Sequence, residues 1–177
     1  DEAEAEILLS HGLQERQTRR LLDGIIAPFF QPEAIKMLTR KKDKCRFLAN
    51  PALAKLDRNS LDQHTRFRYV RGGFLAQPNY TYIFNLEHPE LQITGSFSND
   101  QANDLLLCWA VNATSNSNTI TLVKDRMLIG NGTGQQDRVS ASQLAIKKAK
   151  DAKHNTKDGV AVSDSFFPFE DGPEELC

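Results

Sequence analysis

The sequence predicts an α/β fold, and two observations support this prediction. Segments with the helical spacing of apolar residues alternate along the chain with short apolar or alternating runs that are typical of strands. No internal repeat or low-complexity tract interrupts this alternation. With 177 residues, of which 40% are hydrophobic, the chain is long enough to bury a substantial core.

The first third of the chain is expected to alternate helix, strand, helix and strand. Residues 1–22 carry leucines among charged residues and predict a helix that Gly12 breaks or bends. Residues 24–28 are interpreted as a buried strand that Pro28 stops, because proline has no amide to donate. Residues 32–38 begin with proline, which favours the first turn of a helix. Two weaker patterns follow, a strand at 44–48 and irregular chain at 50–65.

The middle of the chain predicts a bent strand and a helix. Residues 65–78 form a strand or hairpin arm that bends at Gly72 and Gly73. Residues 100–111 have helical periodicity and should pack against a sheet. The side chains expected on the buried side of this helix are Ala102, Leu105, Leu106 and Trp109.

The last third predicts a hairpin, a helix and a final strand. Residues 118–122 and 126–129 alternate, with the turn expected at Lys124 and Asp125. A helix over 136–152 presents a narrow stripe of small apolar residues, suited to close packing on a sheet. The stripe consists of Ala141, Leu144, Ala145, Ala149 and Ala152, and a polar loop at 153–159 and a strand at 160–162 follow.

Charge and cysteine content exclude several classes of protein. The formal net charge of −1 argues against electrostatic binding of nucleic acid or of an anionic membrane surface. No apolar run approaches the roughly 20 residues that span a bilayer, and the acidic start is unlike a signal peptide. Cys45, Cys108 and Cys177 are far apart and form no C-x-x-C pair, so we expect no zinc site, no disulfide and a cytoplasmic protein.

The segment at residues 130–138 is the most informative for function. Its three glycines at alternate positions predict a tight loop before a helix whose first amides attract anions. Arg138, in the first turn, can hold a phosphate or carboxylate through two bonds. A plain strand-to-helix turn with a solvated arginine fits equally well. The spacing matches neither the dinucleotide fingerprint nor the P-loop, although a generic phosphate-binding loop stays open as a hypothesis.

Two further segments carry candidate ligand contacts. Residues 163–171 contain three phenylalanines around a proline and end in acids. Core packing accounts for one or two of the rings, and the others can form an apolar wall beside a carboxylate, suited to a flat heteroaromatic ring. Residues 115–118 either cap the preceding helix or use a side-chain amide to orient a polar ligand.

Taken in order, these segments resemble AICAR formyltransferase, the transformylase domain of the bifunctional purine biosynthesis family. The matching segments lie within about residues 21–172, at 23–28, 33–38, 71–77, 104–111, 115–117, 129–139 and 163–172. The resemblance implies a cytidine-deaminase-like fold, in which helices flank a mixed β-sheet. It also implies that residues 1–177 are part of one formyltransferase domain, and no segment resembles the family's cyclohydrolase domain.

The resemblance implies formyl transfer from 10-formyltetrahydrofolate to the amine of AICAR, the carboxamide-bearing imidazole ribonucleotide, by a homodimer that needs no metal. Asn116 falls on a family position near the reacting centre. The positions that contact the nucleotide in the family correspond to Asp23, Asn116, Arg138 and Phe166, and those that contact the folate correspond to Val139, Pro168, Phe169 and Asp171. A non-catalytic nucleotide- or folate-binding module of the same fold is the alternative.

The sequence departs from the family pattern at the general base. The family has a Lys-His pair upstream of the Asp23 segment, whereas residues 1–22 contain none, and Lys153-His154 is interpreted as a coincidence. We therefore expect these 177 residues alone to bind substrates but to turn them over very slowly. His88-Pro-Glu90 matches half of the zinc-deaminase motif, but no C-x-x-C follows it.

Overall fold

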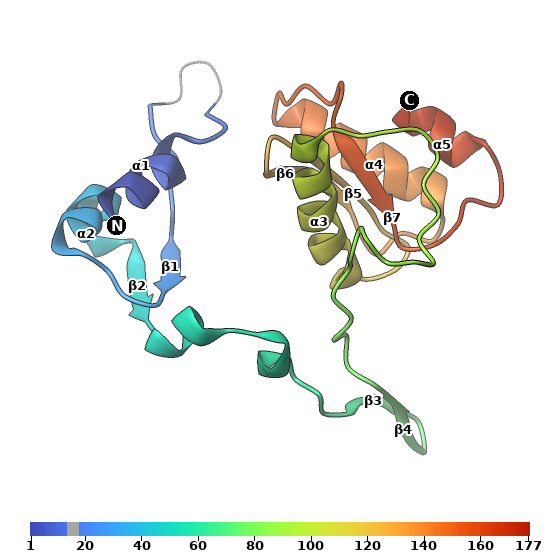
Figure 1. Ribbon diagram of the computed structural model, residues 1–177, viewed down its shortest axis with the longest axis horizontal. Coiled ribbons are helices and arrows are strands. Elements are labelled where there is room, and N and C mark those ends of the chain that lie inside the picture. The colour runs from blue at the N-terminus through green and yellow to red at the C-terminus, as the bar shows by residue number, and fades with distance from the viewer. Residues whose placement is uncertain (14–17) are drawn as a thin grey trace. The chain divides into compact units, whose positions relative to one another are not determined.

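The computed structural model describes residues 1–13 and 18–177 and separates into two compact units, Asp1–Thr65 and Arg66–Cys177 (Figure 1). Helices and strands alternate in both units, so the predicted α/β class is confirmed. Within the described residues the strands form three small sheets, of two, two and three strands.

The first unit is a small βαβ arrangement. Strand β1 (Gly24–Ala27) pairs in parallel with β2 (Arg46–Ala49), and helix α2 (Pro32–Leu38) lies in the connection between them. Helix α1 (Glu2–Ser10) packs on α2 through a core centred on three buried side chains. These are Ala5, Ala34 and Leu38, and short 3₁₀ turns follow at Lys41–Asp43, Pro51–Lys55 and Arg58–Ser60.

The predictions for this unit are largely confirmed, with two corrections. The helix expected over 1–22 ends at Ser10, because Gly12 adopts the left-handed conformation (φ 66°) and residues 18–22 are not helical. Residues 14–17 of that prediction lie outside the described residues. The strand at β1 was expected to be buried, but only one of its faces packs on the core. Ile25 contacts the core cluster, whereas Ile26 points to the opposite face and is 62% exposed.

The second unit has helices on both faces of an antiparallel sheet. The sheet has the order β6-β5-β7, with α3 and α4 packed beside it (Figure 1). Successive side chains of β5 point to opposite faces of the sheet. Ile120 and Leu122 pack against α4, whereas Thr121 meets α3 on the opposite face. The elements of the sheet and its helices are α3 (Asn99–Ala113), β5 (Ile120–Lys124), β6 (Met127–Gly132), α4 (Arg138–Asp151) and β7 (Val160–Ser163). A separate hairpin of β3 (Arg66–Val70) and β4 (Gly73–Gln77) precedes them, and α5 (Asp171–Leu176) ends the chain.

Helix α3 buries polar side chains where apolar ones were predicted. Of the residues expected on the buried side, Ala102, Leu105 and Trp109 are half-buried and Leu106 is 39% exposed. The buried positions of the helix are Asp104, Cys108 and Asn112. Each has a specific partner, since a buried polar group must be hydrogen-bonded. Asp104 accepts from the backbone amides of Asp125 (2.9 Å) and Arg126 (2.6 Å). The helix therefore holds the β5–β6 turn through hydrogen bonds as well as through apolar packing.

Helix α4 packs unusually close to β6. The predicted small-residue stripe is confirmed for Ala141, Ala145 and Ala149, which are fully buried against the sheet, while Ala152 is exposed. Opposite them lie Gly130 and Gly132, which belong to β6. The loop predicted from residue 130 onward therefore begins only after Gly132, and the close approach of α4 accounts for these two glycines. They are required because a side chain at either position would enter the backbone of α4.

Candidate functional site

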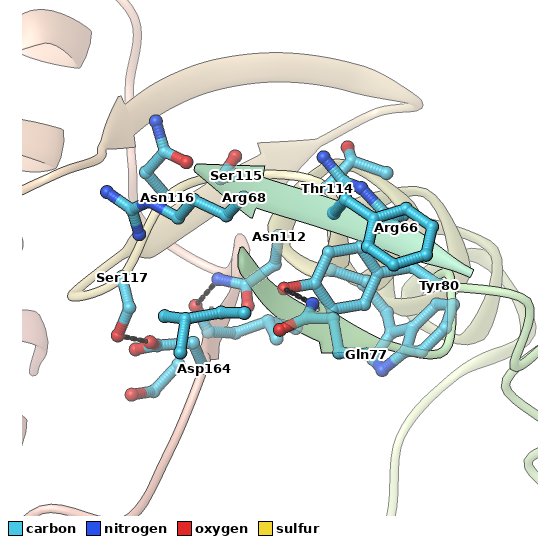
Figure 2. A pocket seen from close by; sticks show the side chains of 16 residues that line it. Arg66, Arg68, Gln77, Tyr80, Asn112, Thr114, Ser115, Asn116, Ser117 and Asp164 are labelled. Atoms are coloured by element: carbon cyan, nitrogen blue, oxygen red, sulfur yellow. Dashed lines mark hydrogen bonds between the residues drawn. The ribbon is translucent and has the colours of Figure 1, made fainter. Parts of the chain in front are cut away.

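A pocket of about 1100 Å³ lies within the second unit, at the end of α3 (Figure 2). One wall is the β3–β4 hairpin, and the other is the loop after α3 together with the end of β7. Its polar lining residues come from all of these elements. They are Arg66, Arg68, Gln77, Tyr80, Asn112, Thr114, Ser115, Asn116, Ser117, Ser163 and Asp164.

The loop that carries Asn116 is held by its backbone and by its neighbours. The carbonyl oxygen of Asn116 accepts hydrogen bonds from the amide of Gly134 (2.8 Å) and the hydroxyl of Thr133 (3.0 Å). The side-chain amide of Asn118 donates to the carbonyl of Gln135 at 3.0 Å. The side chain of Asn116 is itself exposed and has no hydrogen-bond partner in the described part of the chain. The loop thus presents one unengaged amide on a fixed backbone.

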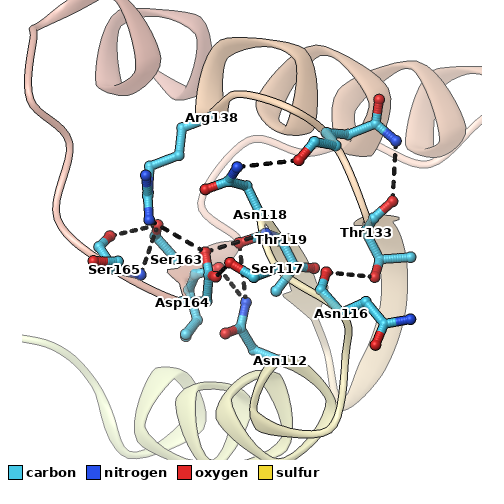
Figure 3. A network of polar contacts seen from close by, with 12 residues as sticks. Asn112, Asn116, Ser117, Asn118, Thr119, Thr133, Arg138, Ser163, Asp164 and Ser165 are labelled. Carbon is cyan, nitrogen blue, oxygen red and sulfur yellow. Dashed lines mark hydrogen bonds and ion pairs between the residues drawn. The ribbon is translucent and has the colours of Figure 1, made fainter. Parts of the chain in front are cut away.

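Asp164 connects the pocket to the start of α4 (Figure 3). Its carboxylate accepts from the backbone amide of Thr119 (3.1 Å) and from the hydroxyl of Ser117, and it lies 3.9 Å from a terminal nitrogen of Arg138. Below it, Asn112 donates to the carbonyl of Val162 at 2.9 Å. This network fixes the relative positions of the Asn116 loop, β7 and Arg138.

Arg138 is close to the carboxylate without being fully satisfied by it. Its side chain is 21% exposed, and its buried Nε has no partner among the described residues. A separation of 3.9 Å from Asp164 is an ion pair but is too long for a hydrogen bond. The guanidinium therefore retains donors for a ligand.

The N-terminus of α4 is occupied by its own cap. The carboxylate of Asp137 accepts from the backbone amide of Ser140 at 2.7 Å, and this hydrogen bond, together with one from the Ser140 hydroxyl, lowers the pKa of Asp137. An anion-binding helix end was predicted here. That prediction is corrected for the Ser140 amide, because Asp137 already takes it.

The aromatic segment after β7 divides into one core ring and two surface rings. Phe167 packs on the core cluster and against Gly172. Phe166 and Phe169 are 77% and 73% exposed, and Pro168 and Asp171 are exposed beside them. This matches the expectation that core packing accounts for one or two of the three rings. The two exposed rings do not line the pocket.

The structure brings together some of the predicted site residues. Asn116 lines the pocket, and Arg138 reaches the same network through Asp164, with Val139 half-buried next to it on α4. Asp23 belongs to the first unit, where its exposed carboxylate pairs with Arg40.

Several lining residues were missed from sequence. Asp164 directly follows β7, and its position at a strand end is the signal that marks it. Arg66 and Arg68 alternate with aromatic residues in β3, which is the pattern of a strand with one polar face.

Two kinds of chemistry have little support at this site. Burial raises the pKa of the Cys108 thiol to about 12, so this cysteine is not a nucleophile near neutral pH. In the described ranges no three His, Cys, Asp or Glu side chains gather where they would hold a metal ion.

No helix described in the structure has the length and apolar character needed to cross a membrane.

Known proteins similar to this chain come from purine biosynthesis. The family described as AICARFT/IMPCHase bienzyme matches residues 8–148. The bifunctional purine biosynthesis protein PurH of Oceanobacillus iheyensis is 33% identical over 161 residues, and that of Persephonella marina is 30% identical over 162 residues; each match covers 90% of this chain. The PurH of Staphylococcus aureus is 32% identical over 92% of the chain. The chain spans about 30% of the length of these relatives.

Proposed function

We propose, because this chain belongs to the AICARFT/IMPCHase bienzyme family, that it forms part of a site that transfers a formyl group from 10-formyltetrahydrofolate to the amine of AICAR in purine biosynthesis. The observation that carries the proposal is the pocket wall made by Asn116, Ser117 and Asp164, which is joined to Arg138. A volume of about 1100 Å³ is sufficient for a nucleotide, since small-molecule sites typically measure roughly 300–1,000 Å³.

The nucleotide is assigned to the amide and cationic groups. Asn116 has an unengaged amide, and the partly exposed guanidinium of Arg138 lies 3.9 Å from Asp164 of the pocket wall, so both are proposed to bind polar atoms of AICAR. Asp23 and Phe166 complete the proposed nucleotide contacts. The folate is assigned to Val139, Pro168, Phe169 and Asp171, because exposed rings beside a carboxylate suit a flat, hydrogen-bonding heterocycle.

The proposed reaction has a simple balance of bonds. The amine nitrogen of AICAR attacks the formyl carbon, the carbonyl oxygen becomes an oxyanion, and the bond from that carbon to folate N10 then breaks. The amine loses one proton, and N10 gains one. Asn116 is proposed to donate its amide hydrogen to the developing oxyanion, since a donor fixed in advance stabilises charge that appears only in the transition state.

The fold and the setting of the reaction are part of the same proposal. Helices on both faces of the β6-β5-β7 sheet support the cytidine-deaminase-like fold that the family resemblance implies. The reaction is assigned to the cytoplasm and is proposed to proceed without metal. Residues 1–177 are proposed to belong to one formyltransferase domain.

The proposed nucleotide contact can be tested at Arg138. We expect Arg138→Ala to weaken AICAR binding ten-fold or more, because loss of a charge-assisted contact costs about 1.5–3 kcal/mol. Isothermal titration measures the affinity. Lys147→Ala is the control, since it removes a cation from the exposed face of the same helix, where Lys147 pairs with Asp151. Equal AICAR affinity in the unaltered protein and in Arg138→Ala would overturn the assignment.

The homodimer is proposed from exposed aromatic surface. Phe67, Tyr69 and Phe74 form an edge-to-face cluster on one side of the β3–β4 hairpin, and all three are largely exposed. Phe166 and Phe169 expose further aromatic area, and a second copy of the chain would cover such surface. We expect light scattering to give the mass of a dimer at high protein concentration. A monomer under these conditions would contradict the proposal.

A further inference from the structure

We infer that Arg66 and Arg68 of β3 bind an anionic group of a substrate in the pocket, a role that no sequence motif assigned to them. The inference rests on the proposed function for the identity of the substrates. It is independent of Arg138, which does not line the pocket.

The register of the hairpin places both arginines on the pocket side. Arg66 pairs with Gln77, and Arg68 pairs with Leu75 in the antiparallel ladder. Directly opposed residues share a face of a sheet, and successive residues alternate between faces. Consequently these four side chains share one face, and all four line the pocket. Phe67, Tyr69 and Phe74, which alternate with them, form the aromatic cluster, and of these three Phe67 also contributes to the pocket lining.

The charges of the pocket are unbalanced in favour of an anion. Asp164 is the one carboxylate among the lining residues, and it is already engaged by Ser117, Thr119 and Arg138. Arg68 has no ion-pair or hydrogen-bond partner in the described ranges. Two arginines thus face a pocket whose single carboxylate is neutralised elsewhere. In Figure 2, Arg68 extends toward the side of the pocket from which Asn116 and Ser117 come.

Arg66 is held in place by an aromatic ring. Its guanidinium carbon lies 5.2 Å from the ring centroid of Tyr80, and the Tyr80 hydroxyl in turn accepts a hydrogen bond from Gln77. A guanidinium that stacks on a ring keeps the N–H donors at its edges available for a ligand. The contact therefore orients Arg66 without consuming its donors.

The shared chemistry of the ligand is an oxyanion that presents two oxygens to one guanidinium. A guanidinium binds such a group through two parallel hydrogen bonds. The proposed substrates offer two sources, the 5′-phosphate of AICAR and the glutamate carboxylates of the folate. Both are remote from the reacting atoms, so the arginines would anchor a substrate and leave the chemical step to other groups.

The test uses substitutions that remove the positive charge and keep a polar side chain. We expect Arg66→Gln and Arg68→Gln each to weaken binding of the anionic substrate about ten-fold, and the double variant to weaken it further. Arg71→Gln, in the turn of the same hairpin and outside the pocket lining, should leave affinity unchanged. Arg68→Lys, which keeps the charge without the planar fork, should restore part of the loss.

Matched probes identify the source of the anion. If the variants weaken AICAR but not its nucleoside, the arginines bind the phosphate; if they weaken triglutamyl more than monoglutamyl folate, they bind a carboxylate. If the unaltered protein binds AICAR, its nucleoside and both folates, and the double variant binds all four with the same affinity, the inference about the arginines is overturned while the proposed function stands.

If the unaltered protein binds neither AICAR nor folate, the proposed function fails. Ribose 5-phosphate and triglutamate then serve as probes, and binding of either that is lost in the double variant still supports the anion site, whereas binding of neither overturns it.

Discussion

Replacing Gly132 by alanine should lower the free energy of unfolding by about 3 kcal/mol or more, at the upper end of the cost of overpacking a core. A Cβ atom at this position would lie 1.9 Å from the carbonyl oxygen of Ala141 and 3.0 Å from the amide nitrogen of Ala145. Both atoms belong to the backbone of α4, so no side chain can rotate away and the helix itself must move. Such a loss is a large share of the roughly 5–15 kcal/mol that stabilises a typical domain.

Urea denaturation followed by circular dichroism measures this effect. The matched control is Gly73→Ala, since Gly73 is also a strand residue of the second unit but has no atom within 4 Å of the position of a Cβ. We expect the control to change the free energy of unfolding by less than about 1 kcal/mol, as open positions do. A similarly small change for Gly132→Ala would show that α4 does not approach β6 as closely as described.

In a protein that also carries the family's Lys-His pair, replacing Asn116 by alanine should reduce kcat for formyl transfer by about 10²–10³-fold, the usual effect of losing one fixed donor to an oxyanion. Because the side chain of Asn116 makes no hydrogen bond in the described structure, its removal should leave the melting temperature unchanged. Consumption of 10-formyltetrahydrofolate in the presence of AICAR is the assay. The prediction applies to kcat more than to KM, since the proposed contact forms in the transition state.

Asn118→Ala is the matched control for loop structure. The Asn118 amide donates to the carbonyls of Gln135 (3.0 Å) and Gln136 (3.1 Å), so its loss should lower the melting temperature and loosen the loop. Asn116→Ala is expected to show the opposite pattern, with intact stability and lost turnover. Normal kcat in Asn116→Ala would remove this residue from the chemistry.

Much of the fold was predictable because the local signals agree with the final packing. Proline favours the start of a helix and begins α2, and the stripe of alanines predicted to pack on a sheet is buried in α4. The β5–β6 turn was expected at Lys124 and Asp125 but lies one residue later, at Asp125 and Arg126. Both have positive φ values, 52° and 58°, which favour glycine or asparagine. Asp104 of α3 stabilises this turn instead, because its carboxylate accepts hydrogen bonds from both backbone amides of the turn.

The candidate site was less predictable, because its members are distant in sequence. Gly130 and Gly132 suggested a ligand loop, whereas their absent side chains make room for α4. Asn112 has the helical spacing of a core residue but the polarity of a surface residue, and the three acceptors of its side-chain amide come together only in the fold. Asn116 and Arg138 were both selected from sequence. Asp164, which links them, was not.

The β3–β4 hairpin has a single backbone layer between its arginine face and its aromatic face. Whatever covers the aromatic face therefore restrains the same strand that holds Arg66 and Arg68. Self-association and anion binding would then both depend on the β3–β4 hairpin, and two coupled binding equilibria affect each other equally. The factor by which assembly strengthens ligand binding must equal the factor by which the ligand strengthens assembly, so the affinity of this pocket would depend on protein concentration.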